Sequence, residues 1–243
     1  MKQWLMGAES AIGYPHKLAL EDAYAYHQRR DGFYGVIADG AGSAKQASFA
    51  AQWVVKEGMD LLEDSFQGLS SASFSKIATH CLENLQQGLR LEAKISGLPL
   101  DDYGCTVLLF LMKKGALFLV QVGDGFVVTG WKGSYMLKLL GPKGQHVNET
   151  NFLTDSTLKV QTLVIEEPLD FLAIGTDGLE SVGIERKEKR AFEGFFKPFD
   201  TYLASGPTSD DIQNELRAFL TSPALLERSR DDKTLFIAKA LDA

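Results

Sequence analysis

Apolar residues recur along this chain with two different periods. In two long stretches they return every three or four positions, the spacing that places them on one face of an α-helix. These stretches cover residues 45–65, with Val54 on the apolar face, and residues 73–96, with Leu85 and Leu89. We therefore predict two consecutive amphipathic helices that lie side by side over one sheet.

Most of the remaining apolar residues form short runs that end at glycine-, lysine- or aspartate-containing turns. This pattern is typical of β-strands, and the tight turns favour antiparallel pairing. We predict strands at residues 4–8, 23–26, 36–38, 103–112, 116–122, 126–131, 135–140, 158–166, 169–174 and 234–240.

Other segments are distinguished by their polar residues. Residues 141–157 are polar and predict a surface excursion, whereas residues 183–199 mix charged and aromatic side chains. We expect a helical turn at residues 200–205 and a longer helix at residues 208–220. Acids fall in the first turn of that longer helix, where the helix dipole favours them.

The composition is that of an ordinary soluble globular protein. The chain has 243 residues, 45% of them hydrophobic and 23% charged, which allows one large domain over residues 1–243 with a sizeable core. The net charge of -7 gives no indication of a nucleic-acid partner.

Two further features bear on where the protein works. Cys81 and Cys105 are too few for a disulfide framework, and free thiols in a core fit a reducing compartment. The N-terminus lacks the apolar segment of a signal peptide, and no apolar run reaches the ~20 residues of a membrane span. We therefore expect a cytoplasmic protein that does not enter a membrane.

The stretch at residues 34–51 predicts a strand, a glycine-rich turn and a helix in succession. Asp39 ends the strand, and Gly40 and Gly42 let the backbone come close to whatever Asp39 holds. A peptide carbonyl beside a carboxylate suits a hard divalent cation. An acidic turn in which Asp39 caps the following helix explains this stretch equally well.

Similar junctions return along the chain. Asp124 and Asp177 follow apolar strands, and Asp231 precedes the last one. If the strands of Asp39, Asp177 and Asp231 are neighbours, their carboxylates converge at one end of a sheet. Such carboxylates would repel and raise one another's pKa unless cations neutralised them.

These carboxylates and the peptide carbonyl would bind a metal through oxygen atoms, which favours magnesium or manganese over zinc. Two such ions about 3.5–4 Å apart can bridge a hydroxide and hold a phosphoryl group.

Two of these acidic sites also have plainer explanations. Asp124 stands in an Asp-Gly pair, which is common in hairpin turns. Glu21 and Asp22 are explained by the solvated end of a strand.

Several catalytic classes are disfavoured by missing motifs. The four histidines are scattered, and the chain has no Gly-Xaa-Ser-Xaa-Gly sequence, which disfavours a serine hydrolase. It also lacks the Gly-Lys-Ser/Thr sequence of a nucleotide-binding P-loop.

The order of six motifs resembles the metal-dependent protein phosphatase 2C family, most closely its compact bacterial branch. The motifs are Glu21-Asp22-Ala23, the run from Val36 to Ser43, Gly104-Cys105-Thr106, Val122-Gly123-Asp124-Gly125, Thr176-Asp177-Gly178-Leu179 and Asp231-Asp232-Lys233-Thr234. The resemblance implies an α+β fold, a four-layer α-β-β-α sandwich of two antiparallel sheets flanked by helices. It also implies hydrolysis of phosphoserine and phosphothreonine in proteins, with two or three Mn²⁺ or Mg²⁺ ions and a cognate serine/threonine kinase.

The resemblance also implies roles for individual residues. Asp39 would bridge two metals, and the Gly40 carbonyl would bind one of them. Asp177 and Asp231 would complete the first metal site. Asp22 or Glu21 would hold waters of the second metal. Asp124 would form a third, weaker metal site with Asp177, and Asp232 would have a secondary role. The nucleophile would be a hydroxide that bridges the metals.

The departures from the family pattern lie at positions that would bind the substrate. The arginine that often precedes the acidic pair is absent, and His16 and Lys17 occupy that region. Either residue is a candidate phosphate binder, and His16 is also a candidate proton donor. Ala41 excludes a general acid at its position. Gly125 and Phe126 stand where a serine and an arginine are common.

Residues 183–205 correspond to the family's flap beside the active site, and their basic side chains could meet an acidic or phosphorylated partner. A solvated charged loop explains the same residues. Two other functions remain open: a weak or inactive phosphatase fold that binds phosphoproteins, and a two-metal phosphoesterase for small phosphate esters.

Overall fold

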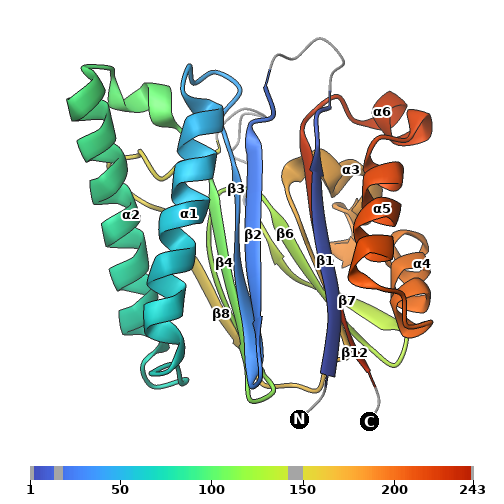
Figure 1. Ribbon diagram of the computed structural model, residues 1–243. Helices are drawn as coiled ribbons and strands as arrows, with labels where there is room; N and C mark the ends of the chain where they lie inside the picture. Colours follow the sequence, from blue (N-terminus) through green and yellow to red (C-terminus); the bar gives the residue numbers. More distant parts are fainter. Residues whose placement is uncertain (1–2, 14–18, 142–149, 242–243) are drawn as a thin grey trace. The chain divides into compact units, whose positions relative to one another are not determined.

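The computed structural model describes residues 3–13, 19–141 and 150–241, which fall into two compact units. The central unit comprises residues 21–124 and 141–167, and the terminal unit comprises residues 1–20, 125–140 and 168–243. Each unit has a five-stranded antiparallel sheet with helices against it (Figure 1). The predicted fold class, α+β with two antiparallel sheets flanked by helices, is confirmed.

In the central unit the sheet is a meander extended by one later strand. Its order is β2-β3-β4-β5-β8, and every neighbouring pair is antiparallel. β2 and β3 form a hairpin, in which Arg29 pairs with Gly32 across a two-residue connection. The bounds are β2 Asp22–Arg29, β3 Gly32–Asp39, β4 Val107–Lys113, β5 Ala116–Val122 and β8 Gln161–Ile165.

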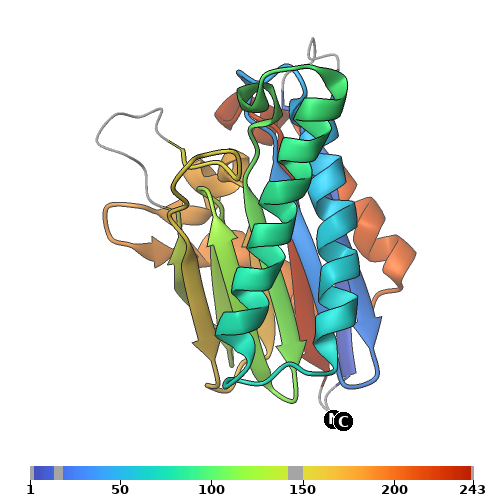
Figure 2. The ribbon, with the colours of Figure 1, turned by 90° about the vertical axis from the view of Figure 1, so that its left-hand side faces the viewer.

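Two long helices, α1 Ala47–Phe66 and α2 Phe74–Ser96, cover one face of this sheet (Figure 2). Both agree with the predicted helices to within two residues at each end. Val54, Leu85 and Leu89 are fully buried in the core that the helices form with β3, β4 and β5. The apolar period of each helix therefore marks the face that packs on the sheet.

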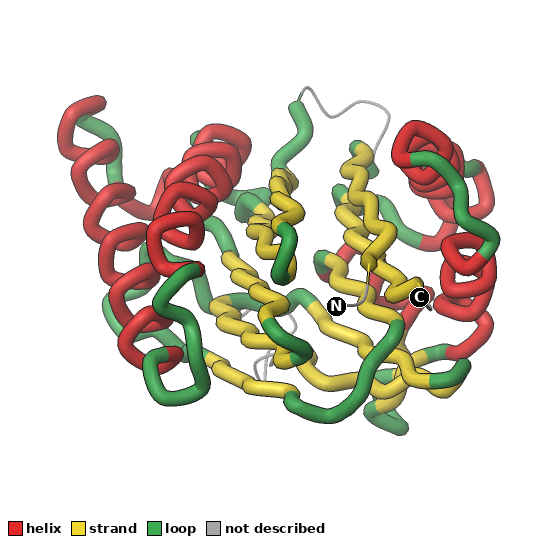
Figure 3. Tube along the Cα trace, turned by 60° about the horizontal axis from the view of Figure 1, so that its bottom comes forward, coloured by secondary structure: helices red, strands yellow, loops and turns green. Residues whose placement is uncertain are grey.

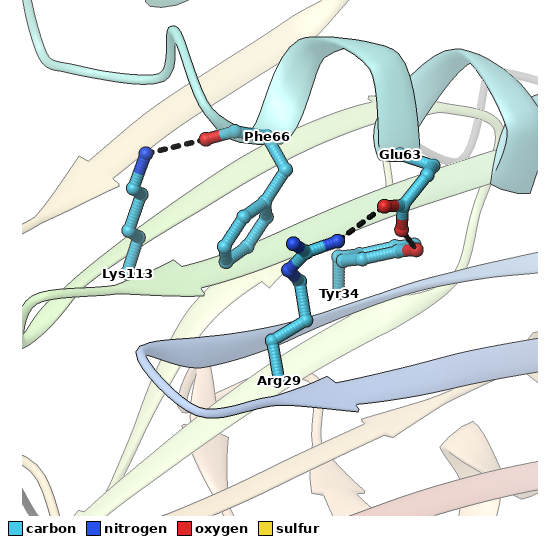
Figure 4. A network of polar contacts seen from close by, with 5 residues as sticks. All are labelled: Arg29, Tyr34, Glu63, Phe66 and Lys113. Atoms are coloured by element: carbon cyan, nitrogen blue, oxygen red, sulfur yellow. Dashed lines mark hydrogen bonds and ion pairs between the residues drawn. The ribbon is translucent and has the colours of Figure 1, made fainter.

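The end of α1 is held by a buried lysine from the sheet (Figure 4). Lys113 on β4 donates from Nζ to the Phe66 carbonyl and, at 2.8 Å, to the Gln67 carbonyl, and its Nζ lies 5.1 Å from the centre of the Phe66 ring. Nearby, Glu63 accepts from both Arg29 and the Tyr34 hydroxyl. Burial and this hydrogen bond raise the pKa of Tyr34 to about 12.

In the terminal unit the sheet contains both the first and the last strand, β1 and β12, as neighbours. Its order is β1-β12-β9-β6-β7, again antiparallel throughout, with β1 pairing with β12 along its whole length. The bounds are β1 Gln3–Ala11, β6 Phe126–Trp131, β7 Ser134–Leu140, β9 Phe171–Gly175 and β12 Lys233–Leu241.

Helices cover one face of the terminal sheet as well (Figure 3). Thr208 caps α5 by accepting from the Asp211 amide at 3.2 Å, while the Asp211 side chain accepts from the Thr208 amide, so the predicted acid-rich helix start is confirmed. The elements on this side are η2 Asp177–Leu179, α3 Glu180–Gly183, β10 Ile184–Glu185, β11 Arg190–Ala191, α4 Glu193–Ala204, α5 Ser209–Leu220 and α6 Pro223–Arg228.

α4 is longer than the sequence predicted. The helical turn expected at residues 200–205 begins at Glu193, because Phe195, Phe196 and Phe199 bury one face and offset the poor helix propensity of Gly194 and Pro198. Asp200 ties α4 to the sheet: its Oδ1 lies 2.7 Å from Lys239 Nζ, and its Oδ2 accepts from the Tyr135 hydroxyl at 2.8 Å.

Other element predictions were wrong in detail. The strand expected from residue 103 begins at Val107, because Leu100–Tyr103 forms a 3-10 helix (η1). The strand expected at residues 158–166 is confined to β8. Of the predicted surface excursion, residues 142–149 lie outside the described residues, but Leu153 is fully buried in the central core. Among the described helices, none has the length and apolarity that crossing a bilayer requires.

Candidate functional site

Two of the acidic residues face each other in the central unit. Asp22, the first residue of β2, pairs in register with Asp39, the last residue of β3. Cross-strand partners of this kind point to the same face of the sheet with Cβ atoms about 4.5–5.5 Å apart. Asp22 is 2% exposed, so the explanation by a solvated strand end is wrong for this residue.

The turn after Asp39 is fixed by hydrogen bonds to residues just before β4. The Thr106 hydroxyl accepts from the Asp39 amide at 3.0 Å, and the Thr106 amide donates to the Asp39 carbonyl at 2.8 Å. Gly40 forms a bridge with Cys105, and the Ala41 amide donates to the Gly104 carbonyl at 2.9 Å. The Gly-Cys-Thr motif therefore holds the Asp39 turn in place.

Gly40 occupies a position that accepts only glycine. A Cβ atom there would lie 2.5 Å from the Ala47 carbonyl oxygen at the start of α1. The Gly40 amide also donates to the Glu21 carbonyl at 3.1 Å, which ties the turn to the acidic pair. The N-cap of α1 is Gln46, so the alternative in which Asp39 caps this helix is wrong.

Cys105 is a buried residue of the core, as the sequence suggested. Burial, with a smaller contribution from the charge of Asp39, raises the pKa of its thiol. The side chain is therefore a neutral, fully buried packing group beside the Asp39 turn.

Asp124 follows β5 and is 6% exposed. The explanation of Asp124 as part of a hairpin turn is wrong, because β5 and β6 belong to different sheets and do not pair. Asp124 Oδ2 accepts from the Thr150 hydroxyl at 2.6 Å. No motif marks Thr150 in the sequence, because it lies in a polar stretch.

Asp177 and the acidic pair at 231–232 come together in the terminal unit, because β9 and β12 are neighbours. The Thr176 amide donates to the Thr234 carbonyl at 3.2 Å, and the Thr234 amide donates to the Thr176 hydroxyl at 2.9 Å. A Cβ atom on Gly178 would lie 1.9 Å from the Asp232 carbonyl oxygen. The turn after β9 thus packs directly on the chain that enters β12.

The two neighbouring acids of this pair differ in their surroundings. Asp232 is 1% exposed, and its Oδ1 accepts from the Gly13 amide at 3.0 Å. Asp231 is exposed, and its Oδ1 accepts from the Asp232 amide at 2.9 Å. Asp232 therefore holds the main chain after β1, while Asp231 is the more accessible carboxylate.

The flap-like segment at residues 183–205 is a short hairpin, β10–β11, followed by α4. Arg186 in the hairpin makes a two-pronged contact with Glu180 of α3, with 2.9 Å between Nη2 and Oε2. Lys187 and Lys189 are exposed. The expectation of a solvated charged loop is therefore wrong for Arg186, which is anchored three residues after Gly183.

The structure thus groups the predicted ligands into two sets. Asp22, Asp39, Gly40 and Asp124 lie in the central unit, and Asp177 and Asp231 lie in the terminal unit. The condition that the strands of all three residues are neighbours is not met, because Asp39 ends a strand of one sheet, whereas Asp177 and Asp231 flank neighbouring strands of the other. His16 and Lys17 lie outside the described residues.

The donor chemistry of both sets fits a hard cation. The side chains are carboxylates, and the close approach at Gly40 brings a main-chain segment beside Asp39. Within the described part of either unit, no three His, Cys, Asp or Glu side chains form a complete metal cluster.

Comparison with known proteins identifies what the chain is similar to. A family model described as protein phosphatase 2C matches residues 14–221. The serine/threonine-protein phosphatase 3 of Escherichia coli (strain K12) is 31% identical over 206 residues, covering 83% of this chain and 81% of that protein.

Solved structures share the fold at low sequence identity. The serine/threonine phosphatase Stp1 from Staphylococcus aureus is 16% identical, with a TM-score of 0.67 over 100% of this chain and 96% of that chain. The catalytic domain of the serine threonine protein phosphatase PstP, solved in complex with two manganese ions, is 16% identical, with a TM-score of 0.67 over 98% of this chain and 99% of that chain.

Proposed function

Because the chain belongs to the protein phosphatase 2C family, a family of phosphoric monoester hydrolases, we propose that it removes phosphate from serine and threonine of proteins with the help of bound Mn²⁺ or Mg²⁺. The observation that carries this proposal is the register pairing of Asp22 with Asp39 beside the Gly40 turn. Two carboxylates opposite each other on neighbouring strands repel unless a cation lies near them.

We propose a ligand set for two or three ions. Asp39 and the Gly40 carbonyl would bind at the centre, with Asp22 and, through water, Glu21 beside them. Asp177, Asp231 and Asp124 would complete the set, with Asp232 in a secondary position, where its carboxylate accepts from the Gly13 amide. Ions held by these residues would supply an activated water as the nucleophile at neutral pH.

The protein's own residues would then have three tasks. Thr106 fixes the main chain of Asp39, and Thr150 orients the Asp124 carboxylate. His16 and Lys17 would bind the phosphate, with His16 also donating a proton to the leaving alcohol. The exposed Lys187 and Lys189 of the hairpin would meet acidic surface on the substrate.

The substrate proposed is a phosphorylated protein. The Escherichia coli relative, which is 31% identical, carries the name of a serine/threonine-protein phosphatase. A phosphatase of this kind needs a kinase that places the phosphate, so we also propose a cognate serine/threonine kinase as a partner.

Two further statements stay predictions. Residues 1–243 form one catalytic domain, and the protein works in the cytoplasm.

The decisive experiment measures hydrolysis of a phosphothreonine peptide and of p-nitrophenyl phosphate while Mn²⁺ is titrated. We expect metal-dependent release of phosphate, reduced more than about 100-fold in Asp39→Asn because a metal ligand loses its charge. Asp60→Asn, the same change on the exposed face of α1, is the matched control and should keep full activity.

Other outcomes would contradict the proposal. Mn²⁺ binding without turnover of either substrate would favour a phosphoprotein-binding module over an enzyme. Faster hydrolysis of nucleotides than of phosphopeptides would identify a phosphoesterase for small esters.

A further inference from the structure

An apolar cavity of about 390 Å³ lies within the terminal unit, between α4, α5 and α6. Its volume falls in the range of small-molecule binding sites, which are concave, mostly apolar and provided with a few polar groups. Five of the lining residues are aromatic, namely Phe192, Phe195, Phe199, Tyr202 and Phe219. The charged residues Glu215 and Arg228 also line the cavity.

The wall of this cavity is held in shape without a ligand. Phe195, Phe199 and Phe219 pack edge to face, with ring centres 5.7 Å apart for Phe195–Phe219 and 5.1 Å apart for Phe199–Phe219. α4 is further fixed by Asp200, 2.7 Å from Lys239 on β12. A ligand would therefore meet a preformed site and would not have to order its wall.

One hydrogen-bond acceptor is built into the wall. Pro198 lies inside α4, four residues after Gly194, and has no amide hydrogen. The Gly194 carbonyl therefore lacks its usual helical donor. Both Gly194 and Pro198 line the cavity, which makes the Gly194 carbonyl the candidate acceptor for a donor on a bound molecule.

The cavity lies at the base of the hairpin β10–β11. Val182 comes just before the hairpin and Phe192 just after it, and both line the cavity. The Phe192 amide donates to the Gly183 carbonyl at 2.8 Å, which closes the base of the hairpin. A molecule in the cavity would touch both ends of the segment that carries Lys187 and Lys189.

We propose that this cavity binds a small aromatic molecule that carries a hydrogen-bond donor. Its flat apolar body lies against the rings of α4 and α5, and its donor binds the Gly194 carbonyl. None of the cavity-lining residues is among the acidic residues assigned to metal binding, and the test of the proposal does not depend on phosphatase activity.

The first experiment compares indole with benzofuran, which has the same shape but no N–H group. Binding to the full chain is followed by NMR of labelled methyl groups, including those of Val182 and Leu225. We expect saturable shifts for indole, and about 2- to 10-fold weaker binding of benzofuran, since one neutral hydrogen bond is lost. If indole does not bind saturably, the proposal is overturned. This holds even if a tryptophan-containing peptide binds in the place of indole.

Two variants test the position and the acceptor. Ala224→Phe fills the cavity from an exposed position of α6 and should weaken indole binding more than about 10-fold by steric exclusion. Ala204→Phe is the matched control, because Ala204 is exposed on α4 and does not line the cavity. Equal indole binding by both folded variants would overturn the assignment.

Pro198→Ala supplies the missing amide to the Gly194 carbonyl and also favours the helix. It should therefore remove the preference for indole over benzofuran while both molecules still bind. A preference that persists in Pro198→Ala would exclude the Gly194 carbonyl as the acceptor and overturn that part of the proposal.

Discussion

Thr106 holds the main chain of Asp39 from both sides, as acceptor of its amide and as donor to its carbonyl, at 3.0 and 2.8 Å. A threonine can do this because its hydroxyl and its own amide are both within reach of one neighbouring residue. The position of the Asp39 carboxylate therefore depends on a residue 67 positions away in sequence.

Thr106→Val keeps the shape of this side chain and removes the hydroxyl. The Asp39 amide then loses its acceptor, so we expect the free energy of unfolding to fall by about 1–2 kcal/mol. The misplaced carboxylate should weaken Mn²⁺ binding about 10-fold, a typical effect of losing a residue that orients a ligand. Urea denaturation and calorimetric Mn²⁺ titration measure the two effects.

Thr106→Ser is the matched control, since it retains the hydroxyl. It should bind Mn²⁺ within about 2-fold of the parent protein. If Thr106→Val also binds Mn²⁺ as tightly as the parent, Thr106 does not position a metal ligand.

At the level of elements, α1 shows how a helix is joined to the sheet below it. Its apolar face packs on β3 and β4, and its last carbonyls are satisfied by Lys113 from β4 (Figure 4). A cation at a helix C-terminus also interacts favourably with the helix dipole. The buried ammonium thus ends α1 at a defined point above the sheet.

Lys113→Met removes this end contact while keeping an unbranched side chain. We expect the free energy of unfolding to fall by about 1–3 kcal/mol, because two carbonyls lose a charged donor. Lys114→Met is the matched control, since Lys114 is exposed and its side chain is not part of the α1 contact. Equal stabilities of the two variants in urea would show that Lys113 does not stabilise the end of α1.

At the level of the whole molecule, the proposed metal ligands are spread over both units, with Asp39 in one and Asp177 in the other. An ion that binds the folded chain and not the unfolded one stabilises it by mass action, by about 2.7 kcal/mol at a hundred times the dissociation constant. Metal binding should therefore be visible in the stability of the protein independently of catalysis.

We expect Mn²⁺ to raise the melting temperature and EDTA to reverse the rise. Asp39→Asn and Asp177→Asn should each abolish most of the increase, whereas Asp60→Asn should retain it. Scanning calorimetry with and without Mn²⁺ measures the change. If Asp177→Asn is stabilised as fully as the parent protein, Asp177 is not one of the metal ligands.

Some of this protein was determined by local sequence. The two long helices were predicted closely because helical period is set by residues three and four positions apart. The acidic residues at strand ends were also predicted from local sequence, because an apolar run and the turn that ends it span only a few neighbouring positions. The order of these motifs along the chain also sufficed for the family, which the comparisons confirm.

Other features were decided only by tertiary structure. The pairing of Asp22 with Asp39, the separation of β5 and β6 into different sheets and the burial of Leu153 all depend on contacts between distant residues. α4 forms despite Pro198 because packing of its phenylalanines outweighs a weak local preference. Local sequence specifies which faces are apolar, whereas strand register and core contacts follow from which distant segments meet.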